Sequence, residues 1–158
     1  MGTLLESRAP VETGMIERVF VYGTLKEGFP NFFRNAGRRV TGSFRTRLAF
    51  PFYVVQLVNE GRAPWLVNTP GQGHRVTGQV FEVDGATLQA MDVFEEVGLP
   101  SGYERVAVDL EPLDAVATEW RAYAYMKQVH QLNECLAIEG PFPEYTRELA
   151  EGYWLAAS

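Results

Sequence analysis

A short apolar run near the N-terminus leads directly into a glycine turn, in the stretch Val19-Phe20-Val21-Tyr22-Gly23-Thr24-Leu25-Lys26. The β-branched and aromatic residues predict a buried strand over residues 17–22, which Gly23 ends. Glycine lets the backbone approach a ligand closely, and successive N–H groups at such a turn can form a concave nest that holds a carboxylate. Most turns of this kind are only connections, and Lys26 is expected to lie in solvent.

Short strands and few helices follow along the rest of the chain. Alternating patterns and turn residues predict further strands at 45–50, 53–58, 65–67, 76–83, 103–110 and 120–126. Helices are expected at 31–36, 86–96 and 144–153, with Asn31 and Asp84 as the caps of the first two. Gly78 inside its strand indicates a bulge or a close approach of two backbones. This order predicts the α+β class, as a strongly curved sheet or a small mixed β-barrel with flanking helices.

The length and the charge limit the organisation and the partners. A chain of 158 residues suits one domain, which we expect at 17–158 behind an irregular N-terminal leader at 1–16. The formal charge of −6 argues against nucleic acid and anionic membranes as partners, because both attract Lys and Arg. No apolar run approaches the roughly 20 residues of a membrane span. The N-terminus lacks the basic start of a secretory signal, so a cytoplasmic protein is expected.

Several common chemistries have no motif in this sequence. There is no glycine-rich dinucleotide loop, Walker loop, His-Glu-x-x-His or Gly-x-Ser-x-Gly. The two histidines, His74 and His130, are interpreted as solvated loop residues. Cys135, the single cysteine, is interpreted as a small apolar residue and not as a nucleophile. We therefore expect no metal site and no cofactor.

A carboxylate on the apolar side of the helix expected at 86–96 is the main candidate for chemistry. Residues on a helix advance by about 100° each. By that rule Met91 lies at about −60° and Glu95 at about −20° relative to Leu88, so Glu95 points to the apolar side. Glu96 lies at about +80°, on the shoulder, and Asp92 at about +40°, which makes Asp92 the rival for an inward role.

An inward carboxylate has one functional interpretation and two structural ones. Burial raises the pKa of a carboxyl group, which suits a general base or acid that works near neutral pH. Alternatively, the helix ends before Glu95, which is then a solvated residue, or Glu95 forms a structural salt bridge, for instance with Arg105. The pattern alone leaves these alternatives open.

The chain as a whole resembles a known family in several segments that occur in the same order. The stretch Tyr22-Gly23-Thr24-Leu25 after an apolar strand matches the signature of the γ-glutamylcyclotransferase-like proteins. The segments Val76-Thr77-Gly78-Gln79-Val80-Phe81, Met91-Asp92-Val93-Phe94-Glu95, Tyr103-Glu104-Arg105 and Ala122-Tyr123-Ala124-Tyr125 resemble further family motifs. The resemblance is strongest to the γ-glutamylamine cyclotransferase branch, which includes the AIG2-like and BtrG-like proteins, and it covers roughly residues 18–126.

The resemblance implies a function and a set of site residues. The implied fold is a β-barrel with flanking helices, and Glu95 ends the motif that carries the family's catalytic glutamate. The implied reaction is intramolecular attack of the α-amine of a γ-glutamyl amide, with Glu95 as general base and acid, to give 5-oxoproline and a free amine. The backbone of Tyr22, Gly23, Thr24 and Leu25 would bind the glutamyl end of this small-molecule substrate. Tyr103 and Tyr125 are second-tier pocket candidates.

Two other functions stay open at this stage. The same fold could bind a small molecule without turning it over, or it could hydrolyse an amide with water in place of the substrate's own amine. The leaving amine, which could be lysine, another amino acid, a peptide or an aminoglycoside, and the oligomeric state cannot be predicted from the sequence.

Overall fold

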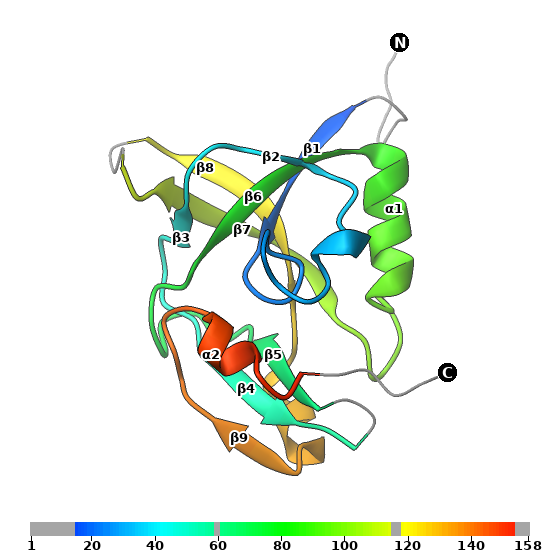
Figure 1. The fold of residues 1–158 in the computed structure, drawn as a ribbon, viewed down its shortest axis with the longest axis vertical. Helices are drawn as coiled ribbons and strands as arrows, with labels where there is room; N and C mark the ends of the chain where they lie inside the picture. Colours follow the sequence, from blue (N-terminus) through cyan, green and yellow to red (C-terminus); the bar gives the residue numbers. More distant parts are fainter. Residues whose placement is uncertain (1–14, 59–60, 115–117, 154–158) are drawn as a thin grey trace.

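A computed structural model describes residues 15–58, 61–114 and 118–153 (Figure 1). The strands are β1 (Ile16–Val21), β2 (Arg38–Arg39), β3 (Phe44–Thr46), β4 (Phe52–Gln56), β5 (Arg62–Leu66), β6 (Thr77–Asp84), β7 (Glu104–Pro112), β8 (Trp120–Met126) and β9 (Ala137–Glu139). The helices are α1 (Gly85–Phe94) and α2 (Arg147–Ala150), with 3-10 helices η2 (Phe32–Arg34) and η3 (Val129–Glu134). In the described part of the chain, no helix is long and apolar enough to cross a membrane.

The larger sheet curls back on itself around β1. Its strand order is β1-β8-β7-β3-β6-β2, and β1 also pairs with β6 along its whole length. The β1–β8 pairing is parallel and the others in this sheet are antiparallel. A second sheet has the order β5-β4-β9 and lies below the first in Figure 1, whereas α1 stands beside β1 and β6. The predicted α+β class with a mixed, curved sheet is confirmed.

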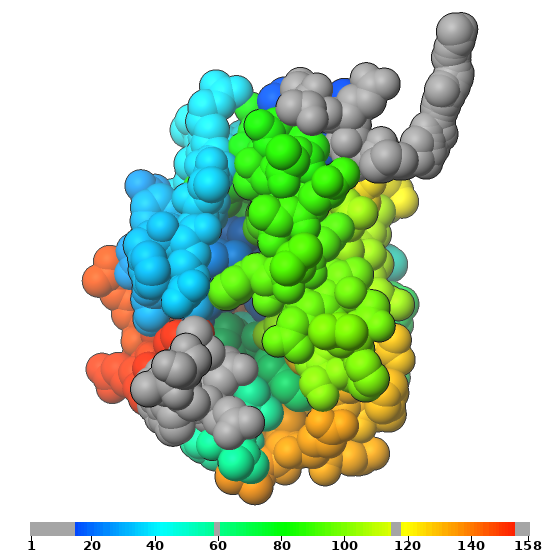
Figure 2. Space-filling view, turned by 90° about the vertical axis from the view of Figure 1, so that its right-hand side faces the viewer, coloured from blue at the N-terminus to red at the C-terminus, as the bar shows by residue number. Residues whose placement is uncertain are grey.

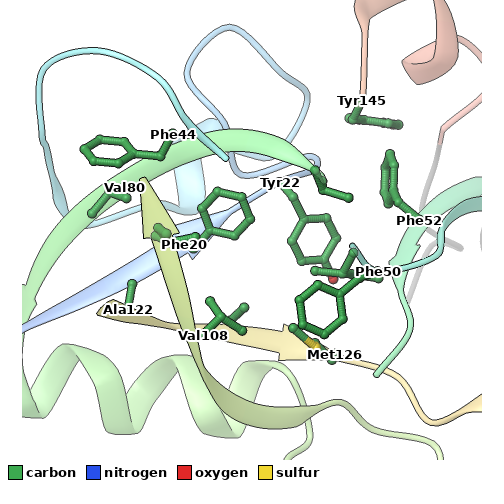
Figure 3. Close-up of a cluster of buried hydrophobic side chains, with 14 of the residues drawn as sticks. Phe20, Tyr22, Phe44, Phe50, Phe52, Val80, Val108, Ala122, Met126 and Tyr145 are labelled. Atoms are coloured by element: carbon green, nitrogen blue, oxygen red, sulfur yellow. The ribbon is translucent and has the colours of Figure 1, made fainter. Parts of the chain in front are cut away.

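Large apolar side chains from both sheets pack into one core cluster (Figure 3). Phe20 from β1, Phe44 from β3 and Phe52 from β4 are almost completely buried, and Tyr145 just before α2 has no exposed surface. Gly78 in β6 allows β1 to come close, because an added Cβ would lie 2.5 Å from the carbonyl oxygen of Val21. The predicted close backbone approach at this glycine is therefore confirmed.

The boundaries differ from the predictions where side chains take unexpected partners. Asp84 caps α1 as predicted, since its Oδ1 accepts from Thr87 N at 2.7 Å, but α1 ends at Phe94. The expected helix at 144–153 shrinks to α2, because Glu144 is held in a β-bridge with Thr77. The expected strand at 45–50 is only β3, and the expected helix at 31–36 is a single 3-10 turn. The strands β2 and β9 and the helix η3 were not predicted.

The ends of the chain test the expected domain division only slightly. Most of the expected leader, residues 1–14, lies outside the described residues, and Ile16 already belongs to β1. The division at 16/17 therefore stays a prediction.

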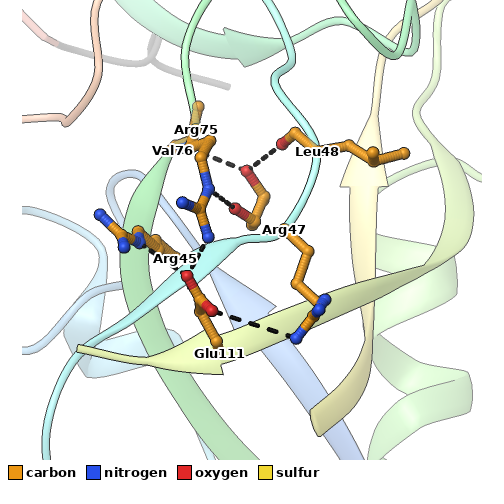
Figure 4. A network of polar contacts seen from close by, with 7 residues as sticks. Arg45, Arg47, Leu48, Arg75, Val76 and Glu111 are labelled. Atoms are coloured by element: carbon orange, nitrogen blue, oxygen red, sulfur yellow. Dashed lines mark hydrogen bonds and ion pairs between the residues drawn. The ribbon is translucent and has the colours of Figure 1, made fainter. Parts of the chain in front are cut away.

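One buried carboxylate organises the end of the sheet formed by β3 and β7 (Figure 4). Glu111 forms ion pairs with Arg45 at 3.1 Å, with Arg47 at 4.0 Å and with Arg75. Burial works to raise the pKa of Glu111, but the hydrogen bonds and charges of Arg45 and Arg75 outweigh it and lower this pKa below its usual range. The network joins β3, β7 and the segment before β6, away from the cavity described next.

Candidate active site

A cavity of about 480 Å³ opens where the C-terminal ends of β1, β5 and β8 meet the segment after α1. Figure 2 looks onto the hollowed face between α1 and the segment around residues 30–40, with β1 visible in the depth. Residues 22–25, Glu95, Tyr103 and Tyr125 all line this cavity. The structure thus brings together every site residue predicted from the sequence.

The loop after β1 turns its carbonyl groups to protein partners. The carbonyl oxygen of Gly23 accepts from Lys26 N at 3.0 Å, and that of Thr24 accepts from Asn31 N at 2.8 Å. The carbonyl oxygen of Leu25 accepts from the side chain of Asn35 at 3.1 Å. The N–H groups of residues 23–25 donate to no other described residue. Because residues 23–25 line the cavity, their N–H groups are the candidates for a backbone nest.

Lys26 and Gly23 fix this loop in place. The expectation that Lys26 lies in solvent is wrong: the side chain is 3% exposed, and its Nζ donates to the carbonyl oxygen of Tyr145 at 2.7 Å. Burial lowers the pKa of Lys26. At Gly23, an added Cβ would lie 2.7 Å from Cγ of Pro64, so the loop packs directly on β5. The tight packing leaves no room for a side chain at this position.

Glu95 is the first residue after α1, not part of it. Its N–H donates to the carbonyl oxygen of Met91 at 2.8 Å, and its own carbonyl accepts from Tyr103 N at 2.9 Å. The alternative in which the helix ends before Glu95 is therefore correct about the helix end. It is wrong about the environment, because Glu95 is half-buried and lines the cavity.

The rival carboxylate, Asp92, is committed to a structural role. Its Oδ1 accepts from the hydroxyl of Tyr125 at 2.7 Å and lies 3.3 Å from Nε of Arg105. These contacts tie the last turn of α1 to β7 and β8. The ion pair considered for Glu95 with Arg105 is thus formed by Asp92.

The charge of Glu95 acts on two buried phenols. Burial raises the pKa of Tyr22 well above its usual value, and the negative charge of Glu95 raises it further. The pKa of Tyr125 is raised by burial first, then by its hydrogen bond to Asp92 and the charge there, with a smaller contribution from Glu95. Glu95, Tyr22 and Tyr125 all line the same cavity, so a negative charge on Glu95 disfavours ionisation of both phenols.

Sequence reasoning missed several residues of the cavity wall. Asn31 is not a side-chain cap for η2; its Nδ2 donates to Thr24 Oγ1 at 3.1 Å and to the Tyr153 hydroxyl at 2.6 Å. Lys127 and Trp65 line the cavity and are both 4% exposed. The sequence did contain a signal that Lys127 lies at the cavity. Residues two apart along an extended chain share a face, and Tyr125 was already a pocket candidate.

The remaining candidates from the sequence are Glu96, the two histidines and the cysteine. Glu96 also lines the cavity but is exposed, and its backbone adopts a φ of 58°. His74 and His130 are exposed, and Cys135 packs partly buried near Trp65. Among the described residues, no group of three His, Cys, Asp or Glu side chains is placed to hold a metal ion.

Comparisons with known proteins agree with this arrangement. A family model described as γ-glutamyl cyclotransferase, AIG2-like, matches residues 19–155. The zebrafish (Danio rerio) protein named γ-glutamylaminecyclotransferase B is 40% identical over 100 residues, which cover 60% of this chain and 50% of that protein. The bovine (Bos taurus) γ-glutamylaminecyclotransferase is 36% identical over 127 residues, covering 76% of this chain and 73% of that protein. The crystal structure of an AIG2-like protein from mouse matches with a TM-score of 0.60 at 34% identity, over 71% of this chain and 77% of that one.

The curved mixed sheet with a cavity at the end of β1 is thus of the same class as the mouse AIG2-like structure. The chain belongs to the γ-glutamyl cyclotransferase, AIG2-like family, since the family model covers most of its length. The match spans 50% of the zebrafish relative's length and 64% of the rat relative's length.

Proposed function

We propose that this protein is a γ-glutamyl cyclotransferase that converts a γ-glutamyl amide into 5-oxoproline and a free amine. The observation that carries the proposal is the meeting of the half-buried Glu95 and the backbone donors of residues 23–25 at one cavity. The names of the zebrafish and bovine relatives support a γ-glutamylamine as the substrate class.

The loop after β1 supplies the binding part of the site. A substrate carboxylate at the glutamyl end accepts hydrogen bonds from the backbone N–H groups of residues 23–25. Because Lys26, Asn31 and Asn35 hold the carbonyl groups of this loop, the donors are fixed before the substrate arrives. A fixed glutamyl end brings the α-amine and the γ-carbonyl of one molecule together, and such proximity lowers the barrier to ring closure.

Glu95 supplies the proton transfers. Its carboxylate takes a proton from the substrate α-ammonium, and the freed amine attacks the γ-carbonyl carbon to form the new C–N bond of the lactam. The original amide C–N bond then breaks as the departing nitrogen receives the proton held by Glu95. The new ring nitrogen gives up its extra proton, and the amine takes up this second proton to leave as an ammonium ion. The products are 5-oxoproline and the amine, and the nucleophile belongs to the substrate.

Three polar side chains near Glu95 are not placed to accept that proton. The hydroxyl of Tyr22 donates to the carbonyl oxygen of Tyr125 at 2.6 Å, and the hydroxyl of Tyr125 donates to Asp92. Both phenols stay protonated at neutral pH, because their pKa values are raised. Asp92 is occupied by Tyr125 and Arg105, so it is not positioned as a second base.

The test is release of 5-oxoproline from a panel of γ-glutamyl amides by the full chain and by Glu95→Gln. General base catalysis contributes a factor of about 10²–10⁴, so we expect kcat of Glu95→Gln to fall by that factor. Glu119→Gln is the matched control, since it makes the same chemical change at an exposed position that does not line the cavity. Equal rates for Glu95→Gln and the wild type would rule out Glu95 as the base.

The same panel separates the other two functions. A binding module would bind the amides and release no 5-oxoproline from any of them. A hydrolase that uses water would still cleave amides whose α-amine is acetylated, whereas a cyclotransferase would not, because the acetylated nitrogen cannot act as the nucleophile.

A further inference from the structure

The segment from Glu95 to Tyr103 forms a closed loop that begins at the proposed base. Its two ends are joined by the hydrogen bond from Tyr103 N to the Glu95 carbonyl oxygen at 2.9 Å. Residues 96–101 are all exposed, so few core contacts hold them. The position of Glu95 therefore depends on whatever fixes the returning end of this loop.

Two buried side chains hold three consecutive carbonyl groups at that returning end. Lys127 Nζ donates to the carbonyl oxygen of Ser101 at 2.7 Å. Gln131 Nε2 donates to the carbonyl oxygens of Gly102 at 3.0 Å and Pro100 at 3.3 Å. Both side chains are 4% exposed. Hydrogen bonds from buried donors, one of them charged, are the stronger kind, and losing them leaves buried polar groups unpaired.

Lys127 and Gln131 are themselves fixed by neighbouring elements. The Lys127 ammonium lies 4.5 Å from the ring centroid of Trp65 and 4.2 Å from that of Tyr103, and its backbone N–H donates to Leu66 at 2.8 Å. Gln131 Oε1 accepts from Gln128 N at 2.7 Å, which closes a capping box at the start of η3. The pair thus presents rigid donors to the loop.

We infer that Lys127 and Gln131 are positioning residues that clamp the loop 95–103 and thereby fix the Glu95 carboxylate against the Tyr22–Leu25 loop. The inference rests on the proposed function, in which Glu95 is the base. The clamp acts on Glu95 from η3 and the residue that follows β8, whereas in the proposed function the loop after β1 holds the glutamyl end of the substrate. Loosening the clamp should therefore reduce kcat more than it changes KM.

The sharpest variant is Gln131→Glu in the full chain. A carboxylate of the same shape still accepts from Gln128 N but cannot donate to the carbonyl groups of residues 100 and 102. Lys127→Met removes the ammonium, and Lys127→Arg retains a charged donor as the conservative rescue. Gln89→Glu is the matched control, because it makes the same chemical change at an exposed position of α1.

Two readouts test the clamp, and the first needs no activity. We expect amide hydrogen exchange at Tyr103, whose N–H is bonded to Glu95, to become about tenfold faster in Gln131→Glu and Lys127→Met but not in the control. We expect kcat for 5-oxoproline release to fall by about tenfold to 10²-fold, the cost of a displacement of up to about 1 Å, with KM within about threefold. Lys127→Arg should recover most of both.

The outcomes separate this inference from the proposed function. Unchanged exchange at Tyr103 in both variants overturns the clamp, whatever the activity. A rise in KM with unchanged kcat also overturns it, because it assigns these side chains to substrate contact. If the wild type turns over no γ-glutamyl amide, the proposed function fails, while faster exchange in Gln131→Glu and Lys127→Met would still establish that the pair holds the loop.

Discussion

Gly102 lies where the loop that starts at Glu95 folds back onto its own beginning. A Cβ added at Gly102 would lie 1.8 Å from the carbonyl oxygen of Glu96 and 2.5 Å from its carbonyl carbon. An ordinary contact is about 3.4 Å, so Gly102→Ala requires a displacement of about 1.6 Å in the backbone next to the proposed base. A displacement of about 1 Å at a catalytic group can cost about 10²-fold in rate, so kcat should fall by at least that factor.

The effect on stability should be smaller than the effect on rate. Overpacking in a folded structure costs about 1–3 kcal/mol, which for a chain of this size lowers Tm by about 2–12 °C. Because the loop is largely exposed, we expect the lower half of this range. The first measurement is the initial rate of 5-oxoproline release at saturating substrate, taken well below the Tm of the variant. The second is a thermal melt followed by circular dichroism.

Gly98→Ala in the same loop is the control that isolates the clash. Gly98 has a φ of +90°, so alanine is strained there, but no atom lies within 4 Å of the added Cβ. We expect a similar fall in Tm with kcat within a few-fold of the wild type. If Gly102→Ala retains the kcat of Gly98→Ala, the position of the Glu96 carbonyl does not control the base, and the reasoning is refuted.

Three further outcomes follow from the buried polar groups. Asn31→Ala removes the side-chain hydrogen bonds to Thr24 and Tyr153 and so loosens the loop proposed to bind substrate. We expect KM to rise about tenfold with a smaller change in kcat, and an unchanged KM in steady-state kinetics would contradict this. Burial raises the pKa of Tyr22, Tyr125 and Tyr145 above the unfolded value of about 10, so their contribution to stability is present below that pH and is lost as the pH rises above it. In urea titrations above about pH 10, the free energy of unfolding should therefore fall less steeply in Tyr22→Phe than in the wild type, by about 1.4 kcal/mol per pH unit. The lowered pKa of Glu111 contributes stability that is present above about pH 4.5 and is lost as the pH falls below it. The Tm of Glu111→Gln should therefore fall less with acid than that of the wild type. Equal slopes of Tm against pH for the two proteins would exclude the effect.

Local patterns in the sequence predicted the fold class and several of the elements that surround the cavity. The strand before Gly23 and the Asp84 cap of α1 are local features, in which the residue types set the structure of their own neighbours. The helical wheel predicts Glu95 on the side of Leu88 and Met91, and Glu95 does line the cavity, although it lies one residue beyond the helix for which that side was calculated.

The partners of the site could not be predicted, because they are distant in the chain. The local sequence predicts Asn31 as a helix cap, yet its side chain donates hydrogen bonds to Thr24 and to Tyr153, which is 122 residues away. The local sequence predicts Lys26 as a solvated charge, but in the fold Lys26 is buried and its Nζ donates to the carbonyl oxygen of Tyr145. Single-sequence patterns report on neighbours along the chain, whereas these roles depend on tertiary contacts that override local preference.

The helix end explains why two carboxylates three residues apart have different roles. Asp92 lies inside the last turn of α1, where its direction is set by the helix and where Tyr125 and Arg105 pair with it. Glu95 lies one residue beyond the helix, so its direction is set by the loop that returns through Tyr103. Asp92 therefore anchors the helix, whereas Glu95 lines the cavity.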